Sequence, residues 1–195
     1  IVRRIDQPDA EVIVPHAVDH HAGEERIARI RNPARQAFAA LRRRRSRAQL
    51  LLVGGADARE RAAVKAIAGR LGITDAVALH GRADEHDYWG ILKAADLAVQ
   101  LRTGAGGGEA SGAVCDCVAA RVPAIVSDVG WFGELPEPVV TAVPEDCEAE
   151  RLAAEMEGLI GDEARRAEAR AAQDEYAREN SFARVAERYA ELLSL

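Results

Sequence analysis

The segment between Arg102 and Pro123 begins with a glycine-rich stretch, residues 102–111, that holds the residues whose types and spacing are best suited to chemistry. Four glycines fall within five residues there, followed by an acid, Glu109, and a small hydroxyl residue, Ser111. Glycine lets a ligand approach the main chain closely, and the first N–H groups of a helix lack partners inside it, so a strand–loop–helix junction is a natural phosphate site. The Glu109 carboxylate suits hydroxyl groups rather than an anion. Together these groups suit a sugar nucleotide, and the alternative is a solvent-exposed turn that carries one acid.

The residues on either side of this stretch predict the elements that position it. An apolar run at residues 97–101 precedes the glycines, a helical apolar pattern begins at Ala113, and a second apolar run, Ala124–Ser127, follows Pro123. Strand, glycine-rich loop, helix and strand in this order form the layout of a parallel βαβ unit.

Strands and helices alternate along the rest of the chain. Further strands are predicted at residues 11–14, 49–53, 77–79 and 139–143, and helices from Pro33, over 58–71, after Asp84 and through most of 146–195. Because the strands read as apolar on both faces, the chain predicts an α/β fold, a Rossmann-like parallel sheet covered by helices on both faces. Ligands of such sheets bind beyond the carboxyl ends of the strands.

The composition excludes several classes of protein. The chain of 195 residues carries a formal net charge of -6, which argues against a general nucleic-acid binder. It has no apolar run long enough to span a membrane and no signal peptide, so the cytoplasm is the expected compartment. The three cysteines do not suggest a disulfide framework. The basic run at residues 42–45 is expected to be a solvated helix end, with a patch for phosphates or for an anionic membrane surface as the alternative.

The motifs at the ends of the predicted strands follow one another in a recognisable order. They are LLVGG at 51–55, LHGR at 79–82, AADLAV at 94–99, GEASG at 108–112, DCVAARVP at 116–123 and VGWFGELP at 129–136. In this order they resemble the C-terminal, donor-binding domain of a GT-B-fold glycosyltransferase, in particular of glycosyltransferase family 4. The match covers roughly residues 12–195. The resemblance implies one half of a GT-B fold, a donor domain at 1–195 with C-terminal helices at 146–195, and an N-terminal acceptor domain absent from these residues.

The resemblance also implies roles for individual residues. Glu109 would be the catalytic residue and hold hydroxyls of the donor sugar, and Asp116 would hold the ribose hydroxyls. Arg82 lies where main-chain atoms of the family read the nucleobase. The N–H groups of residues 111–113 would meet the diphosphate or the sugar. The remaining donor-binding residues implied by the family are Gly54, Gly55, Gly81, Gly108, Ser111, Gly112, Ala113 and Glu134.

Two features depart from the family pattern. The family separates two glutamates by seven residues, whereas six residues separate Glu109 from the shorter Asp116, so a solvated helix residue is the alternative for Asp116. The family also has a strand with an Arg and a Lys that neutralise the donor diphosphate, and no such strand precedes Gly54. Either those residues are missing from this sequence, or Arg29 and Arg31 take their place, or the phosphate site is impaired.

The expected function is retaining, metal-independent transfer of a glycosyl group, without a cofactor, from a nucleotide sugar such as a UDP or GDP sugar. The acceptor would be a sugar, lipid or small molecule. Without the acceptor domain, the isolated chain is expected to bind donor weakly and transfer little. One alternative is a degenerate, non-catalytic nucleotide-sugar-binding module. Another is a nucleotide-sugar epimerase of the same architecture, for which only His16 and His80 are available near the rim.

Overall fold

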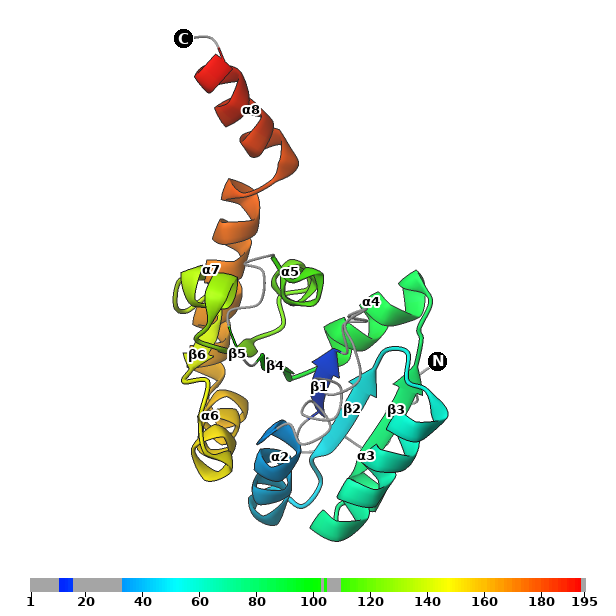
Figure 1. Ribbon diagram of the computed structural model, residues 1–195. Helices are drawn as coiled ribbons and strands as arrows, with labels where there is room; N and C mark the ends of the chain where they lie inside the picture. The colour runs from blue at the N-terminus through cyan, green and yellow to red at the C-terminus, as the bar shows by residue number, and fades with distance from the viewer. Residues whose placement is uncertain (1–10, 16–32, 103, 105–109, 194–195) are drawn as a thin grey trace.

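The centre of the molecule is a six-stranded parallel sheet with the strand order β3-β2-β1-β4-β5-β6 (Figure 1). The structure is a computed structural model, and it describes residues 11–15, 33–102, 104 and 110–193. The strands are β1 (Glu11–Pro15), β2 (Gln49–Val53), β3 (Val77–Gly81), β4 (Leu97–Gln100), β5 (Ala124–Ser127) and β6 (Thr141–Val143). This is the strand order of the Rossmann fold, so the predicted α/β fold is confirmed.

Helices cover both faces of this sheet, as predicted. On one face lie α2 (Pro33–Arg44), α3 (Ala58–Leu71) and α6 (Ala149–Gly161), and on the other lie α4 (Glu85–Ala94), α5 (Gly112–Ala119) and α7 (Glu163–Glu179). The side chains of β2 alternate between the two layers, because successive residues of a strand point to opposite faces. Leu50 and Leu52 pack with α2 and α3, whereas Leu51 and Val53 pack with Ile91 of α4.

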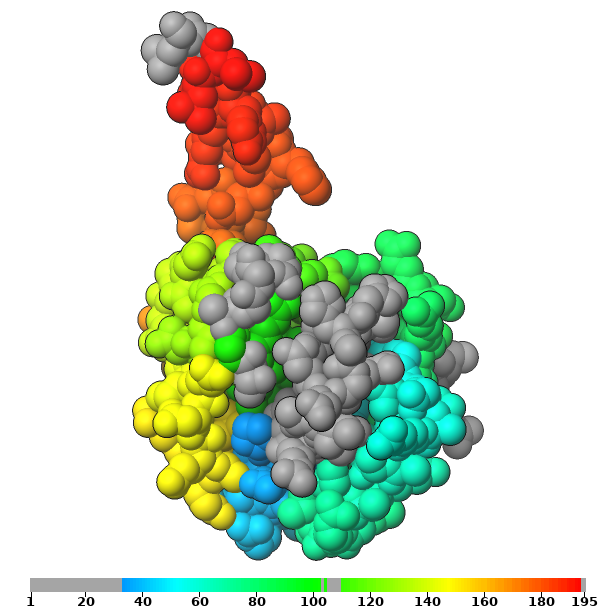
Figure 2. Space-filling model, viewed as in Figure 1, coloured from blue at the N-terminus to red at the C-terminus, as the bar shows by residue number. Residues whose placement is uncertain are grey.

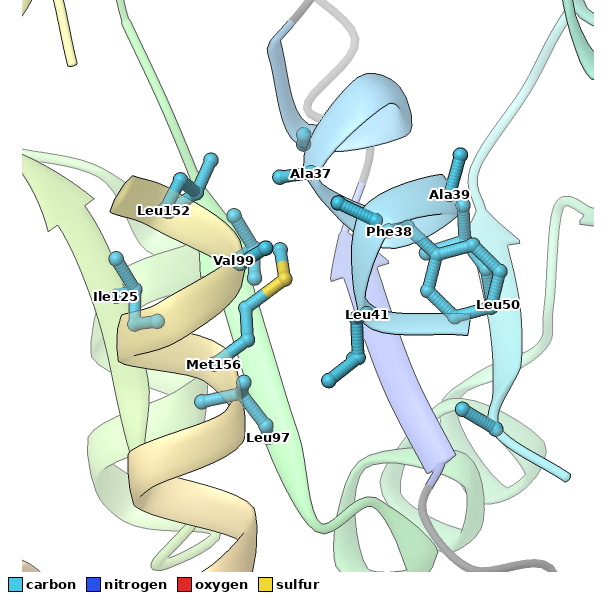
Figure 3. Packing of buried hydrophobic residues seen from close by; sticks show 14 of the residues in the cluster. Ala37, Phe38, Ala39, Leu41, Leu50, Leu97, Val99, Ile125, Leu152 and Met156 are labelled. Atoms are coloured by element: carbon cyan, nitrogen blue, oxygen red, sulfur yellow. The ribbon is translucent and has the colours of Figure 1, made fainter. Parts of the chain in front are cut away.

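The larger of the buried clusters lies where α2 and α6 meet the middle of the sheet. Phe38 of α2 and Met156 of α6 are fully buried there, and Figure 3 shows Met156 beside Leu97 and Val99 of β4. Burying one side chain of this size contributes about 1.5–3 kcal/mol. This packing therefore holds β4 firmly, and β4 leads directly into the glycine-rich stretch.

Local capping signals determine where the chain turns between strands and helices. Asp57 and Glu60 form a capping box at the start of α3, with both bonds at 2.8 Å. The Asp84 carboxylate accepts the backbone N–H of Asp87 at 2.8 Å at the start of α4. Gly72 ends α3 in the left-handed conformation, with φ 68°. Because these signals are local, the prediction of a helix over 58–71 is correct at both ends.

Some strand predictions were wrong in detail. β3 continues to Gly81, the strand predicted at 97–101 ends at Gln100, and the strand predicted at 139–143 begins only at Thr141. The expectation that the strands are apolar on both faces fails for β3, where Ala78 and His80 are exposed. The reason is that β3 lies at the edge of the sheet, where the neighbouring helices do not cover it completely.

The basic run at the end of α2 is not simply a solvated helix end. Arg43 and Arg44 form ion pairs with Glu150 of α6 at 2.7 and 3.1 Å. Arg44 also pairs with Glu157 at 3.1 Å. Acidic side chains of α6 therefore offset the charge of this run and tie the two helices together.

The last helix, α8 (Phe182–Leu193), extends away from the body of the molecule at the end of α7 (Figures 1 and 2). It has no buried residue, and Phe182 and Leu193 are 97% and 84% exposed. Tyr189 and Leu192 are also large exposed side chains. Ser181 caps this helix, because its hydroxyl accepts the N–H of Arg184 at 3.4 Å. Among the described helices, none has the length and apolar character required to cross a membrane.

Candidate functional site

The carboxyl edge of the sheet has its topological switch point between β1 and β4, which are neighbours. From β1 the chain winds outward through β2 and β3, and from β4 it winds the opposite way through β5 and β6. In open α/β sheets such a point forms the crevice that binds ligands. The glycine-rich stretch follows β4, so it begins at this point. Glu109 and Gly108, two of the predicted site residues, lie outside the described residues.

The start of α5 presents polar groups of the kind that bind an anion. Ser111 is the N-cap residue, it is only 3% exposed, and its side chain makes no capping bond. Its buried hydroxyl oxygen has no hydrogen-bond partner among the described residues. The N–H groups of Gly112 and Ala113 belong to the first turn, where a helix provides no partner for them. The helix dipole adds partial positive charge at the same place.

The first residues of the glycine-rich stretch are anchored to the neighbouring strand ends. The Arg102 N–H donates at 2.9 Å to the buried hydroxyl of Ser127, the last residue of β5. The Arg102 guanidinium carbon lies 4.7 Å from the centre of the Phe132 ring, a cation–π arrangement. The Gly104 N–H donates to the Glu145 carboxylate at 2.6 Å, just after β6. Sequence reasoning did not select Arg102, although a cation directly after a buried strand is a recognisable signal.

Asp116 lies in α5 and is hydrogen-bonded to α4. The Tyr88 hydroxyl donates to Asp116 Oδ2 at 3.0 Å, and both residues are half-buried. Burial raises the pKa of Tyr88, and the Asp116 carboxylate raises it further. Asp116 is therefore not merely a solvated helix residue, and its partner comes from the helix that begins after β3.

Four predicted residues come together at the ends of β2 and β3. The Gly54 N–H donates to the Gly81 carbonyl at 2.7 Å. A Cβ added to Gly55 would lie 3.3 Å from Arg82 Nε, so the Arg82 side chain lies against Gly55. Gly81 has φ 76°, a conformation that favours glycine and that turns the chain toward Arg82. In the strand order this group is separated from the start of α5 by β1.

Glu134 lies toward α7. It belongs to η2 (Gly130–Glu134), a short 3₁₀ helix within the motif at 129–136, and it is exposed. Tyr176 of α7 has a raised pKa, caused by burial first, then by Cys115 and then by Glu134. The Glu134 carboxylate therefore acts electrostatically on the Tyr176 hydroxyl.

The remaining candidate groups are the histidines and the cysteines. His80 is exposed on β3, and His16 is not described. Within the described ranges, no group of three or more His, Cys, Asp or Glu residues is arranged to hold a metal ion. Cys115, Cys117 and Cys147 are all free thiols.

The fold and the site together define the class of Rossmann-like domains that bind ligands at the carboxyl edge of a parallel sheet. The family model for glycosyl transferases group 1 matches residues 33–180. The chain therefore belongs to the glycosyl transferases group 1 family, as the motifs at 51–136 led us to expect. No curated protein sequence matches the chain.

Solved structures confirm that the fold is one half of a GT-B fold. HepE from Anabaena, solved in complex with UDP, is similar with a TM-score of 0.73 and 20% identity over 96% of this chain and 49% of HepE. WaaG, a glycosyltransferase involved in lipopolysaccharide biosynthesis, has a TM-score of 0.69 and 19% identity over 95% of this chain and 47% of WaaG. Sucrose-phosphate synthase from Thermosynechococcus elongatus has a TM-score of 0.65 and 21% identity over 96% of this chain and 47% of the synthase. The chain thus spans about half the length of these proteins.

Proposed function

We propose that this domain binds the nucleoside diphosphate part of a sugar donor at the carboxyl edge of its sheet, for glycosyl transfer to an acceptor. The observation that carries the proposal is the buried Ser111 hydroxyl, which lacks a partner among the described residues and belongs to the N-cap residue of α5 beside the switch point. A phosphate oxygen would satisfy this hydroxyl together with the first N–H groups of α5. Family membership favours glycosyl transfer over the epimerase alternative.

The groups along this edge have the order that an extended nucleotide requires. Gly81 and Arg82 lie at the end of β3 and would contact the base. Asp116 is bonded to α4, the helix that starts just after Arg82, and would accept hydrogen bonds from the ribose hydroxyls. The start of α5 follows the glycine-rich stretch and would hold the diphosphate. Because HepE was solved with UDP, a UDP sugar is the first donor to test.

The leaving diphosphate needs positive charge, and Arg102 is our candidate to supply it. Its guanidinium lies over Phe132 at the beginning of the glycine-rich stretch. Arginine keeps its charge under all ordinary conditions and matches phosphate oxygens with a fork of N–H donors. Arg29 and Arg31, the alternatives named from the sequence, lie outside the described residues.

We further propose the retaining, metal-independent reaction that the family resemblance implies. The bond between the anomeric carbon and the diphosphate oxygen breaks, an acceptor oxygen bonds to the same face of that carbon, and the acceptor's proton passes to the departing diphosphate. Glu109 would hold the hydroxyls of the sugar during this exchange. Helix N–H groups and Arg102 would stabilise the negative charge that develops on the diphosphate.

The acceptor site is proposed to belong to a second domain. The chain spans about half the length of the solved proteins it resembles. The exposed side chains of α8, including Phe182 and Leu193, would find apolar contacts on such a domain. Residues 1–195 alone are therefore expected to bind donor weakly and to transfer little.

Calorimetric titration with UDP, GDP, ADP and their sugar conjugates tests the proposal. We expect one nucleotide to bind selectively and its sugar conjugate to bind more tightly. Ser111→Ala should weaken the binding of that nucleotide about tenfold, since a hydrogen bond to a charged group contributes about 1.5 kcal/mol or more. Ser181→Ala is the matched control, because Ser181 caps α8, and it should leave binding unchanged.

Two outcomes would contradict the proposal. Equal affinities of Ser111→Ala and the parent chain would remove Ser111 from the phosphate site. Failure of every nucleotide to bind would favour a degenerate domain that has lost donor binding. Loss of sugar-conjugate binding in Glu109→Ala, with UDP binding retained, would support the role of Glu109 at the sugar.

A further inference from the structure

The hydrogen bond from Tyr88 to Asp116 joins two helices that belong to different parts of the nucleotide site. α4 begins after Gly81 and Arg82, whereas α5 begins after the glycine-rich stretch. Tyr88 is in the first turns of α4, and its hydroxyl lies 3.0 Å from Asp116 Oδ2. Sequence reasoning gave Tyr88 no part in the site.

The bond has a specific effect on the carboxylate. The terminal torsion of an aspartate is broad, so an unrestrained carboxylate samples many orientations. A donor bonded to Oδ2 limits this rotation, and Oδ1 still has lone pairs for other donors. An aspartate also reaches less far than the glutamate of the family pattern, so its orientation matters more for contact with a ribose.

The surroundings of Tyr88 keep its hydroxyl in place. The Tyr88 ring packs with the buried cluster that contains Leu92 of α4 and Val114 of α5. It also contacts the neighbouring Trp89 ring edge to face, with centroids 6.1 Å apart. A ring held by packing loses little further freedom when its hydroxyl binds the carboxylate.

We propose that Tyr88 is a positioning residue for ribose recognition, whose hydroxyl orients the Asp116 carboxylate toward the vicinal ribose hydroxyls of the nucleotide. This inference rests on the proposed function, because it assigns the ribose to Asp116. Tyr88 itself does not touch the ligand. It makes the affinity for a ribonucleotide depend on α4 as well as on α5.

The experiment compares a nucleotide with its analogue that lacks both ribose hydroxyls. Titrations use UDP and 2′,3′-dideoxy-UDP. If GDP or ADP binds more tightly than UDP, that nucleotide and its 2′,3′-dideoxy analogue are used instead. The variants are Tyr88→Phe, Asp116→Ala and the double variant. Tyr189→Phe is the matched control, because Tyr189 lies exposed on α8.

Tyr88→Phe should weaken ribonucleotide binding about fivefold, the effect of one net hydrogen bond. It should leave binding of the dideoxy analogue unchanged, which a merely structural role of Tyr88 would not do. Asp116→Ala should weaken ribonucleotide binding more, and adding Tyr88→Phe to it should have no further effect. Tyr189→Phe should match the parent chain with both ligands.

The other outcomes separate this inference from the function on which it rests. If Tyr88→Phe weakens the binding of both ligands equally, or weakens neither, the positioning role of Tyr88 is overturned. In that case, weaker ribonucleotide binding by Asp116→Ala would still support the assignment of the ribose to Asp116. No binding of any nucleotide by the parent chain would overturn the proposed function and this inference together.

Discussion

Arg121 has a left-handed backbone conformation that predicts an unusual response to substitution. Among the residues that the structure describes, it is the one non-glycine residue with positive φ, at 59°. A side chain in this region costs about 1–2 kcal/mol, because its Cβ approaches a carbonyl oxygen. Glycine avoids that cost but loses about 0.5–1 kcal/mol more entropy on folding. Glycine should therefore be more favourable than alanine here by roughly 0.5–1 kcal/mol.

The side chain of Arg121 adds a second, smaller contribution. Its guanidinium forms an ion pair with Asp174 of α7, and the two side chains are 62% and 46% exposed. Pairs with this exposure contribute about 0.2–1 kcal/mol. Arg121→Gly and Arg121→Ala both remove the pair, so the difference between them isolates the backbone. Arg121→Gly should match the parent chain within about 0.5 kcal/mol, and Arg121→Ala should be less stable by about 0.6 kcal/mol.

Urea unfolding followed by circular dichroism measures these differences, provided that the transitions have the same slope. Asp174→Ala is the control, since it removes the ion pair and leaves the backbone of Arg121 unchanged. Its loss of stability should be no larger than that of Arg121→Ala. An Arg121→Ala variant as stable as Arg121→Gly would refute the assignment of backbone strain to this position.

Gln173 and the cysteines lead to two more predictions. Gln173 is fully buried, and its Nε2 donates to the carbonyls of Val122 and Val139 at 2.9 and 3.0 Å. Gln173→Ala should lower the free energy of unfolding, measured by urea titration, by about 3 kcal/mol. A loss below about 1 kcal/mol would contradict the stabilising role of these two hydrogen bonds. Burial raises the pKa of the Cys117 thiol to about 12, whereas Cys115 is exposed. A disulfide reagent near pH 8 should therefore label Cys115 first and Cys117 only on unfolding, and fast labelling of Cys117 in the folded protein would contradict its burial.

The sequence departs from the family pattern in lacking the Arg and Lys strand and in carrying a shorter acid at Asp116. The proposed roles of Ser111, Tyr88 and Arg102 address both departures. In the proposed site a buried hydroxyl and helix N–H groups would provide neutral donors for the diphosphate, and Arg102 lies at the beginning of the same stretch. Titration of Arg102→Ala and Arg29→Ala in parallel would identify which cation the donor uses. The shorter acid at Asp116 is accompanied by a fixed partner, Tyr88.

Much of the fold was predictable because its signals are local. The capping box of Asp57 and Glu60 and the closing Gly72 mark both ends of α3. Fully buried apolar runs mark β4 and β5, and the alternation of strands with helices implies a parallel sheet. Right-handed crossovers alone do not fix the strand order. The order also depends on the side of the preceding strand on which each connection places the next strand. The exposed edge of β3 could not be predicted, because it depends on which strands became neighbours.

The site was predictable only in part. The glycine-rich stretch and the start of α5 are continuous in sequence, so their residue types indicated a phosphate site directly. Gly54 and Gly81 were expected on one edge, and the structure places them in contact. The roles of Glu109 and Gly108 stay predictions, since these residues lie outside the described part of the chain. Glu134 was expected at the donor edge on the basis of the motif alone, and its electrostatic effect on Tyr176 of α7 became evident only from the structure.

The sequence by itself determined the fold class, the capped helices and the family motifs, because hydrophobic period, capping and turn chemistry act over a few residues. Only the tertiary structure decided the partners of side chains that are far apart in the chain. Tyr88 reaches Asp116 across 28 positions, and Arg43 reaches Glu150 across 107. Such contacts have no local pattern in the sequence. They exist because the sheet order and the packing of helices on its two faces bring these particular positions together.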